Sequence, residues 1–222
     1  MLSTIRKEVI DIGQQVKTHR EPISIICFSI ALIAIFKERK PIVPMFHLDG
    51  IGDYYLNRMI YWGIVPMIFG TLITRKSPLK LGLGIGDYRY WLPVTLTFLL
   101  IAIPIVYFFS ASPDFQSYYA QKNFDLPQYL INVTVLMLGW EYFFRGFMTM
   151  TLKPTIKETT ILIQMIPFTL LHLGKPVVET LACIPSGLFW GYVCYRAESF
   201  WPALIMHLAI NIVLKCGSVG YL

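Results

Sequence analysis

The amino-acid sequence predicts an all-α fold: a polytopic membrane protein whose helical bundle has about seven transmembrane helices. Hydrophobic residues make up 55% of the chain and charged residues only 14%, whereas about a quarter of the residues in an average soluble domain are charged. The mean hydropathy is +0.58. Apolar runs alternate with short polar segments along nearly the whole sequence. We therefore expect most of the chain to lie in a bilayer.

The apolar runs cover residues 22–36, 58–74, 91–110, 127–152, 160–173, 177–195 and 201–216. Several are shorter than the roughly 20 residues that a helix needs to cross a membrane. The run 160–173 would reach about 21 Å, short of a hydrocarbon core of about 30 Å, and Gly174 and Pro176 follow it at once. We expect this helix to break near the middle of the membrane, where protein or a water-filled cavity must satisfy its backbone.

Residues 1–21 mix basic residues with isoleucine and valine, and they predict an N-terminal amphipathic cytoplasmic lead-in. Either a helix on the membrane surface or a solvated helix would fit. Residues 22–222 are expected to form a single membrane domain. Eleven Lys and Arg residues lie on the predicted side of the N-terminus and seven on the other, which favours a cytoplasmic N-terminus.

The net charge of +6 is explained by this topology and by anionic membrane lipid, and we expect no nucleic-acid partner. The four cysteines lie within or beside apolar runs and lack C-x-x-C spacing. They are therefore interpreted as small hydrophobic residues.

Three pairs with i,i+4 spacing occur inside the C-terminal apolar runs: Glu141 with Arg145, Phe168 with His172, and His207 with Asn211. Residues four apart share one face of a helix, so three such helices could enclose one polar cavity. Ionisable groups at membrane depth indicate a functional site. Interhelical hydrogen bonding is the structural alternative.

Such a set of side chains can activate water. A carboxylate with a histidine can take a proton from water that attacks a peptide carbonyl, while a second histidine and an amide stabilise the oxyanion. Arg145 is expected to hold the Glu141 carboxylate in place. Glu179 follows Lys175 by four residues, and it either pairs with that lysine or faces the same cavity as His172. Two His and one Glu could also bind zinc, but the spacing is not H-E-x-x-H, so no metal and no cofactor are expected.

The motifs resemble the CPBP family of intramembrane proteases, which includes CAAX prenyl proteases and bacteriocin-processing or Abi-type proteins. The family pattern is E-E-x-x-x-R, F-x-x-x-H and H-x-x-x-N. The chain has Glu141 to Arg145, Phe168 to His172 and His207 to Asn211 in that order, and Gly187 to Gly191 with Ser199 to Pro202 is similar to the linker before the last motif. The resemblance implies a catalytic core at about 127–216.

The family resemblance implies a glutamic intramembrane endopeptidase that requires no metal and cleaves a membrane-embedded or lipid-linked peptide. Glu141 and His172 would activate water, and His207 and Asn211 would form the oxyanion hole. It also implies a multi-pass protein of a prokaryotic inner or plasma membrane, in contact with membrane lipid.

One residue departs from the family pattern, because Trp140 stands where the first glutamate is expected and an indole cannot accept a proton. Glu141 or Glu179 could then be the base. Alternatively, catalysis is lost, and the chain is a pseudoprotease or a membrane binding or scaffold protein. A transporter would also place polar groups near the midplane, but no internal repeat is present. Substrate identity and oligomeric state do not follow from the sequence.

Overall fold

The computed structural model describes residues 2–37 and 51–222, and the regular structure of these residues is helical. The predicted all-α class is therefore confirmed. The chain divides into two compact units, Met1–Pro41 and Ile42–Leu222, which are described separately. The predicted boundary between residues 21 and 22 stays a prediction.

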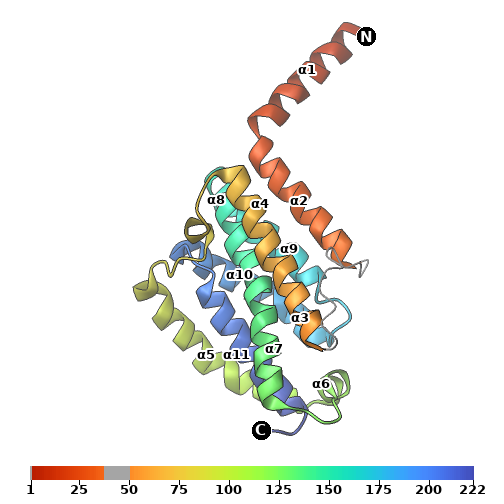
Figure 1. Cartoon of the computed structure of the whole chain (residues 1–222), viewed down its shortest axis with the longest axis vertical. Coiled ribbons are helices and arrows are strands. Elements are labelled where there is room, and N and C mark those ends of the chain that lie inside the picture. The colour runs from red at the N-terminus through yellow and green to blue at the C-terminus, as the bar shows by residue number, and fades with distance from the viewer. Residues whose placement is uncertain (1, 38–50) are drawn as a thin grey trace. The chain divides into compact units, whose positions relative to one another are not determined.

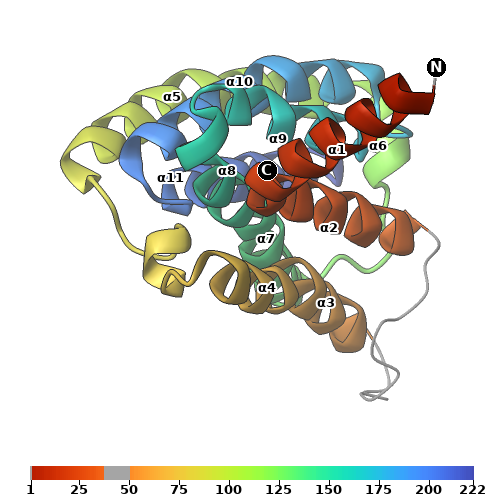
Figure 2. The same cartoon turned by 90° about the horizontal axis from the view of Figure 1, so that it is seen from above.

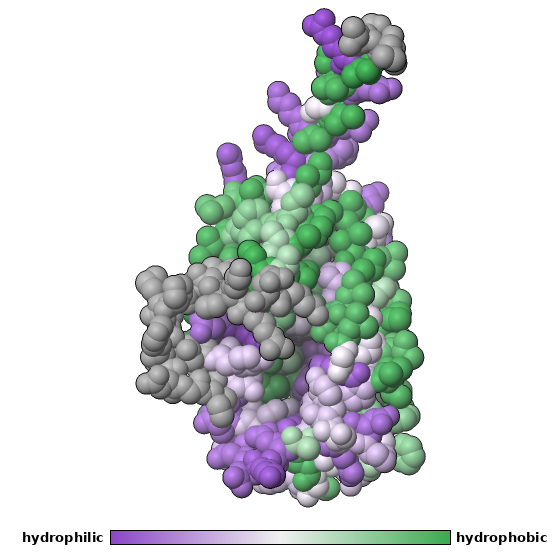
Figure 3. Space-filling view, turned by 90° about the vertical axis from the view of Figure 1, so that its right-hand side faces the viewer, coloured by the Kyte–Doolittle hydropathy of each residue, from purple (hydrophilic) through white to green (hydrophobic). Residues whose placement is uncertain are grey.

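The first unit contains α1 (Leu2–Thr18) and α2 (Arg20–Lys37), and their axes differ by 82°. Along α1, Ile5, Val9, Ile12 and Val16 are all exposed and recur at the three- and four-residue spacing of one helix face. Figure 3 shows hydrophobic residues in green running along α1, with hydrophilic residues in purple beside them. The helix is thus amphipathic, and its placement at a membrane surface stays a prediction.

Within the described residues, four helices are long and apolar enough to span a membrane: Tyr54–Thr74, Tyr88–Ser110, Val177–Ala197 and Trp201–Ser218. A fifth span results if the bent pair α1 and α2 is counted as one. The sequence predicted about seven apolar runs. There are fewer span candidates than apolar runs for two reasons. The run 160–173 forms only the short helix α9 (Thr159–Leu170). The run 127–152 contains the polar residues Asn132, Glu141 and Arg145.

A long helical segment at the centre of the larger unit is formed by α7 (Leu126–Glu141), the π-helical segment η3 (Tyr142–Met148) and α8 (Thr149–Ile156). A second combines α3 (Ile51–Met59), η1 (Ile60–Ile64) and α4 (Val65–Thr74). Figures 1 and 2 show α7 between the α3–α4 segment and α11 (Trp201–Ser218). The close packing of α7 on α3 requires glycine at position 139, since a Cβ on Gly139 would lie 2.9 Å from the Met59 Cα.

Helices α9 and α10 (Val177–Ala197) form an antiparallel hairpin. Gln164 on α9 donates a hydrogen bond from Nε2 to the Gly187 carbonyl at 2.9 Å. A Cβ on Gly187 would lie 2.9 Å from the Met165 Cγ, so the absence of a side chain sets the close packing. α9 has 12 residues, about 18 Å of helix. The chain then reverses through residues 171–176, where His172 lies.

Helix α5 (Tyr88–Ser110) packs along α11, and α6 (Pro113–Tyr119) follows α5. Residues 82–87, before α5, dock on the turn between α10 and α11. The Phe200 amide donates to the Gly82 carbonyl at 3.0 Å, the Ser199 Oγ donates to the Gly84 carbonyl at 2.8 Å, and the Trp201 Nε1 donates to the Leu83 carbonyl at 3.0 Å. These bonds fix the start of α11, which carries His207.

A close contact between α5 and α11 gives a stability prediction. A Cβ on Gly217 would overlap the Ser110 hydroxyl and lie 2.8 Å from the Ser110 Cβ. Gly217→Ala is therefore expected to destabilise the protein by about 1–3 kcal/mol, the usual cost of overpacking, in a thermal unfolding assay in detergent. Adding Ser110→Gly should recover part of the loss. Gly13→Ala, with nothing within 4 Å, is the control and should not destabilise. Equal stability of Gly217→Ala and wild type would contradict this packing.

Candidate active site

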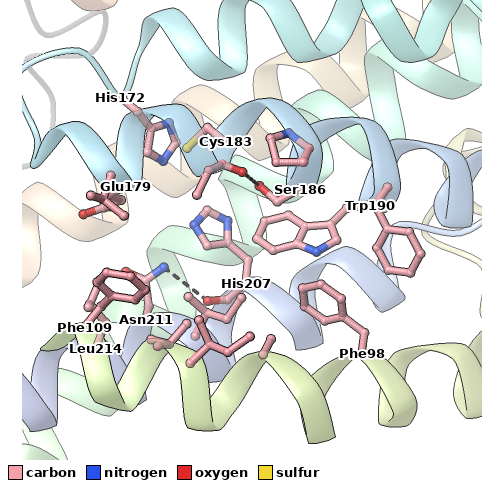
Figure 4. Close-up of a pocket in the computed structure, with 18 of the residues that line it drawn as sticks. Phe98, Phe109, His172, Glu179, Cys183, Ser186, Trp190, His207, Asn211 and Leu214 are labelled. Atoms are coloured by element: carbon pink, nitrogen blue, oxygen red, sulfur yellow. Dashed lines mark hydrogen bonds between the residues drawn. The ribbon is translucent and has the colours of Figure 1, made fainter.

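A cavity of about 440 Å³ lies between α5, α10 and α11. Four of the six predicted site residues line it: His172, Glu179, His207 and Asn211. The other lining residues are mainly apolar and include Phe98, Phe168, Phe189 and Trp190. Figure 4 shows the rings of His172 and His207 on neighbouring parts of the wall, with Asn211 below them. Glu141 and Arg145 are not among the lining residues.

Glu141 lies behind the cavity wall and is completely buried. Its Oε1 is 2.5 Å from the Nδ1 of His207 and accepts a hydrogen bond from the Nη1 of Arg145 at 3.3 Å. The same Nη1 lies 3.0 Å from Oε2. Glu141 thus contacts its predicted partner on α7–η3 and also a histidine on α11. Because the Glu141 carboxylate occupies Nδ1, the other ring nitrogen of His207 is left on the cavity side.

The π-helical segment η3 begins directly after Glu141 and contains Arg145. A π-helix adds a residue to the turn and changes which side chains share a face, and such segments are frequent at functional sites. The Thr149 Oγ1 donates a hydrogen bond to the Phe144 carbonyl at 2.8 Å, and it thus supplies a side-chain donor to a backbone carbonyl within the π-helical segment. The seven residues of η3 are all buried, so this irregular segment lies in the interior of the unit.

Arg145 is completely buried, and aromatic rings surround it. Its Cζ lies 3.9 Å from the centroid of the Phe168 ring and 5.6 Å from that of Trp190. Within the described part of the chain, its Nε and Nη2 have no hydrogen-bond partner. Cation–π attraction is strongest where water is excluded. Glu141 and these rings therefore provide the compensation that a buried guanidinium requires.

His172 lies in the turn that follows α9, and its Nδ1 is 2.7 Å from the Phe168 carbonyl. Because a carbonyl only accepts, Nδ1 carries the proton, and Nε2 of the neutral ring has a free lone pair. This contact accounts for the F-x-x-x-H spacing through the backbone of Phe168. The ring centroids of His172 and His207 are 6.2 Å apart, so one small group between the rings can contact both.

Asn211 is one helical turn beyond His207 on α11. Its Nδ2 donates to the His207 carbonyl at 3.2 Å, which uses one of the two amide protons. Tyr129 on α7 donates from its hydroxyl to the Asn211 carbonyl at 3.0 Å. The first bond holds the Asn211 side-chain amide near His207 on the wall of the cavity, and the second joins the backbone of α11 to α7.

Glu179 meets both sequence-based alternatives, because it pairs with Lys175 and also lines the cavity. The Lys175 Nζ lies 2.7 Å from Oε1, and the hydroxyl of Tyr119 on α6 donates to Oε1 and Oε2 at 2.9 and 2.8 Å. Burial and the adjacent carboxylate raise the pKa of Tyr119, so the phenol keeps its proton and remains a donor. Glu179 therefore has three short polar contacts at the edge of the cavity.

Trp140 lies against His172, with the ring centroids 5.9 Å apart in a T-shaped arrangement. Its ring also contacts Trp62 and Phe144, with centroids at 5.4 and 5.3 Å. Among the described residues its Nε1 has no hydrogen-bond partner. An apolar ring therefore occupies the side of His172 that faces α7.

Sequence reasoning missed Tyr119, which contacts Glu179 from 60 residues away, and the aromatic wall formed by Phe98, Phe189 and Trp190. No spacing rule connects a tyrosine in a polar loop with a glutamate on a distant helix, and aromatic residues on a membrane helix commonly face lipid. In the part of the chain that the structure describes, no three His, Cys, Asp or Glu side chains are grouped as a metal ion requires.

The helical fold, the apolar helices and the buried Glu–His centre define an integral membrane protein with a polar site inside an apolar bundle. Residues 122–213 match the family model described as type II CAAX prenyl endopeptidase Rce1-like, and this confirms the resemblance to the CPBP family. The matched region contains every predicted site residue, and the family supports a CAAX-type intramembrane protease kind of function. No curated protein and no solved structure matches the chain.

The buried contact of Glu141 with Arg145 gives a prediction that is independent of activity. Glu141→Gln or Arg145→Met alone should destabilise the protein by about 3–5 kcal/mol, because each leaves a buried charge without its partner. The double variant should lose less than the sum of the two, since no unpaired charge remains. Thermal unfolding in one detergent measures all four proteins. Strict additivity would contradict the interaction.

Proposed function

We propose that the protein is an intramembrane endopeptidase that hydrolyses a peptide bond in a membrane-embedded or lipid-linked substrate. The observation that carries the proposal is the pair of imidazoles on one cavity wall, 6.2 Å apart, each with its Nδ1 held by a fixed partner. We place the enzyme in a prokaryotic inner or plasma membrane, with its N-terminus in the cytoplasm. The family match at residues 122–213 supports this class of activity.

His172 acts as the general base in the proposed reaction. A water molecule between the imidazoles transfers a proton to the Nε2 of His172 while its oxygen forms a bond to the carbonyl carbon of the substrate. The electron pair of the C=O double bond moves to the carbonyl oxygen, where the second amide proton of Asn211 and a protonated Nε2 of His207 stabilise the oxyanion. The electron pair of the oxyanion then re-forms the C=O double bond, the C–N bond breaks with its electrons on nitrogen, and this nitrogen takes the proton from Nε2 of His172.

Glu141 and Arg145 are assigned positioning roles in this scheme. The Glu141 carboxylate binds the Nδ1 of His207 and so directs the Nε2 of the same ring towards the cavity, and Arg145 holds the carboxylate. Glu141 as the direct base is less well supported, because it does not line the cavity. Glu179 does line the cavity, but its carboxylate oxygens already accept hydrogen bonds from Lys175 and Tyr119.

The activity prediction uses a quenched fluorogenic peptide that ends in a CAAX sequence with a prenylated cysteine, in line with the matched family. His172→Ala should lower kcat by about 100- to 10,000-fold, the usual contribution of a general base, and His207→Ala should lower it comparably. His19→Ala, which lies between α1 and α2, is the matched control. Glu179→Gln should retain activity within about tenfold. Loss of activity in Glu179→Gln with full activity in His172→Ala would contradict the assignment.

Trp140 favours a second candidate function, a non-catalytic membrane protein that binds a peptide or lipidated tail in the same cavity. The indole packs on His172 at the position where the family pattern has glutamate, and both nearby carboxylates are held by cations. A cavity of this kind can bind without reacting.

The two functions are separated by Trp140→Glu with the same peptide. Hydrolysis by the wild type, lost in His172→Ala, supports the protease. Binding without hydrolysis by the wild type, together with hydrolysis by Trp140→Glu, supports the non-catalytic function. Trp91→Phe is the stability control, because the Trp91 Nε1 donates to the Ile85 carbonyl at 2.8 Å outside the cavity.

A further inference from the structure

Helix α1 carries an exposed apolar face that the proposed function does not use. Ile5, Val9, Ile12 and Val16 are between 49% and 62% exposed, and their three- and four-residue spacing places them on one face of the helix. We call this face the α1 stripe. Single exposed apolar residues are normal on a protein surface, but a contiguous apolar patch marks an interaction site. The α1 stripe therefore requires a partner.

Helix α2 has the composition of a helix that crosses a membrane. Its charged residues, Arg20, Glu21 and Lys37, stand at its two ends, and no charged residue occurs between them. Its 18 residues extend about 27 Å, close to the roughly 30 Å of a hydrocarbon core. Ile30, near the middle, is 61% exposed, as a side chain that faces lipid would be. The bent pair of α1 and α2 qualifies as one further span, and α2 supplies its uncharged part.

The bend between the two helices turns α1 into the plane of the membrane, because their axes differ by 82°. Pro22 has no amide hydrogen for the Thr18 carbonyl, and its ring pushes that carbonyl away. The helix therefore opens on the face of Thr18 and bends towards the opposite face. Val9 is nine residues, or about two and a half turns, before Thr18, so the α1 stripe lies on that opposite face.

The cartoon and the surface show the same relation. In Figure 1, α1 and α2 both extend from their junction towards the right of the view. Figure 3 shows the molecule from that side, with the hydrophobic residues of α1 facing the viewer. The α1 stripe therefore lies on the inner side of the corner, the side towards which α2 runs. When α2 enters the bilayer, the stripe faces the same bilayer.

The polar residues of α1 suit the headgroup region of a membrane. Arg6 and Lys17 are eleven residues apart, about three turns, and they border the α1 stripe on the same side. Basic side chains at this position keep their stems on hydrocarbon and reach phosphate groups with their charges. Asp11 and Gln14 lie on the face opposite the stripe, which would remain in water. Glu8 borders the other side of the stripe, so we assign no preference for a lipid of one charge.

We propose that α1 is an interfacial helix: it lies on the membrane surface with the α1 stripe at the boundary between phospholipid headgroups and hydrocarbon, and the corner from Thr18 to Pro22 joins it to the spanning α2. The partner of the stripe is the phospholipid bilayer that α2 crosses. Of the two placements that the sequence left open, the structure thus favours the surface helix over the solvated one. The proposal concerns the first unit alone and does not depend on the proposed protease function.

Electron paramagnetic resonance of nitroxide labels tests this placement in the full chain. Ile12→Cys and Gln14→Cys, on the stripe and on the opposite face, are a matched pair. Each is labelled in a background in which the four natural cysteines are replaced by alanine, and each is reconstituted in vesicles of phosphatidylcholine and phosphatidylglycerol. The label at position 12 should be more accessible to oxygen than to nickel ethylenediaminediacetate and lie about 5–10 Å below the headgroup surface. The label at position 14 should show the reverse.

Three results would overturn the proposal. Equal access of the nickel reagent to both labels would show a solvated helix. Low access of both reagents to the label at position 12 would show that protein covers the stripe, either the larger unit or a second copy of the chain. A label at Ile30→Cys should lie deeper than the other two, and a shallow position would contradict α2 as a span and with it the placement of α1.

Hydrogen exchange provides a second test in which the natural cysteines stay in place. In lipid nanodiscs, Val9→Asp should accelerate amide exchange of residues 2–18 about tenfold or more, because a charge on the stripe drives α1 from the boundary and a short helix without support is marginal in water. Gln14→Asp introduces the same residue on the opposite face and should leave exchange close to that of the wild type. Equal acceleration in both variants would overturn the proposal.

Discussion

The structure of the site depends on the burial of one carboxylate between two cationic or hydrogen-bonding partners. Glu141 and Arg145 are both completely buried, and a charge in an apolar interior is tolerated only when it is paired. The His207 Nδ1, 2.5 Å from the carboxylate, adds a contact from another helix. The requirement to satisfy Glu141 therefore sets the position of α11 relative to α7 and directs the second nitrogen of His207 into the cavity.

The surrounding packing makes this arrangement possible. The π-helical segment η3 turns Arg145 back towards Glu141 within an aromatic shell, and the Phe168 ring covers the guanidinium at 3.9 Å. Phe168 also supplies the carbonyl that holds His172. One aromatic residue thus links the buried ion pair with the second imidazole. Small residues such as Gly139 and Gly187 bring the helices close enough for these contacts to form.

Much of the site could be predicted from the sequence, because i,i+4 spacing inside an apolar run defines one helix face. The contact of Glu141 with Arg145 follows from that rule. The pairing of Lys175 with Glu179 also forms, although Lys175 lies before the first residue of α10. The rule describes single helices and contains no information on their rotation about one another. It therefore did not indicate that Glu141 would lie behind the cavity wall and bind His207. Tyr119, Phe98 and Phe189 reach the site through tertiary contacts alone.

The fold could be predicted to a similar extent. Hydropathy gave the all-α class, and Gly174 with Pro176 indicated that the helix before them would end early, as α9 does at Leu170. The number of spans was harder to predict, because hydropathy alone does not show how an apolar run is divided into helical segments. The run 127–152 is one example, since a π-helical segment interrupts it and polar residues line its buried side.

His172 and His207 each present Nδ1 to a fixed partner and leave Nε2 for chemistry. Nitrogen-15 NMR of histidine-labelled protein in lipid nanodiscs measures this directly, with His172→Gln and His207→Gln used for assignment. We expect that Nδ1 of His172 is protonated and its Nε2 is not, and that Glu141→Gln shifts the resonances of His207 much more than those of His172. A proton on Nε2 of a neutral His172, or resonances of His207 that do not respond to Glu141→Gln, would contradict it.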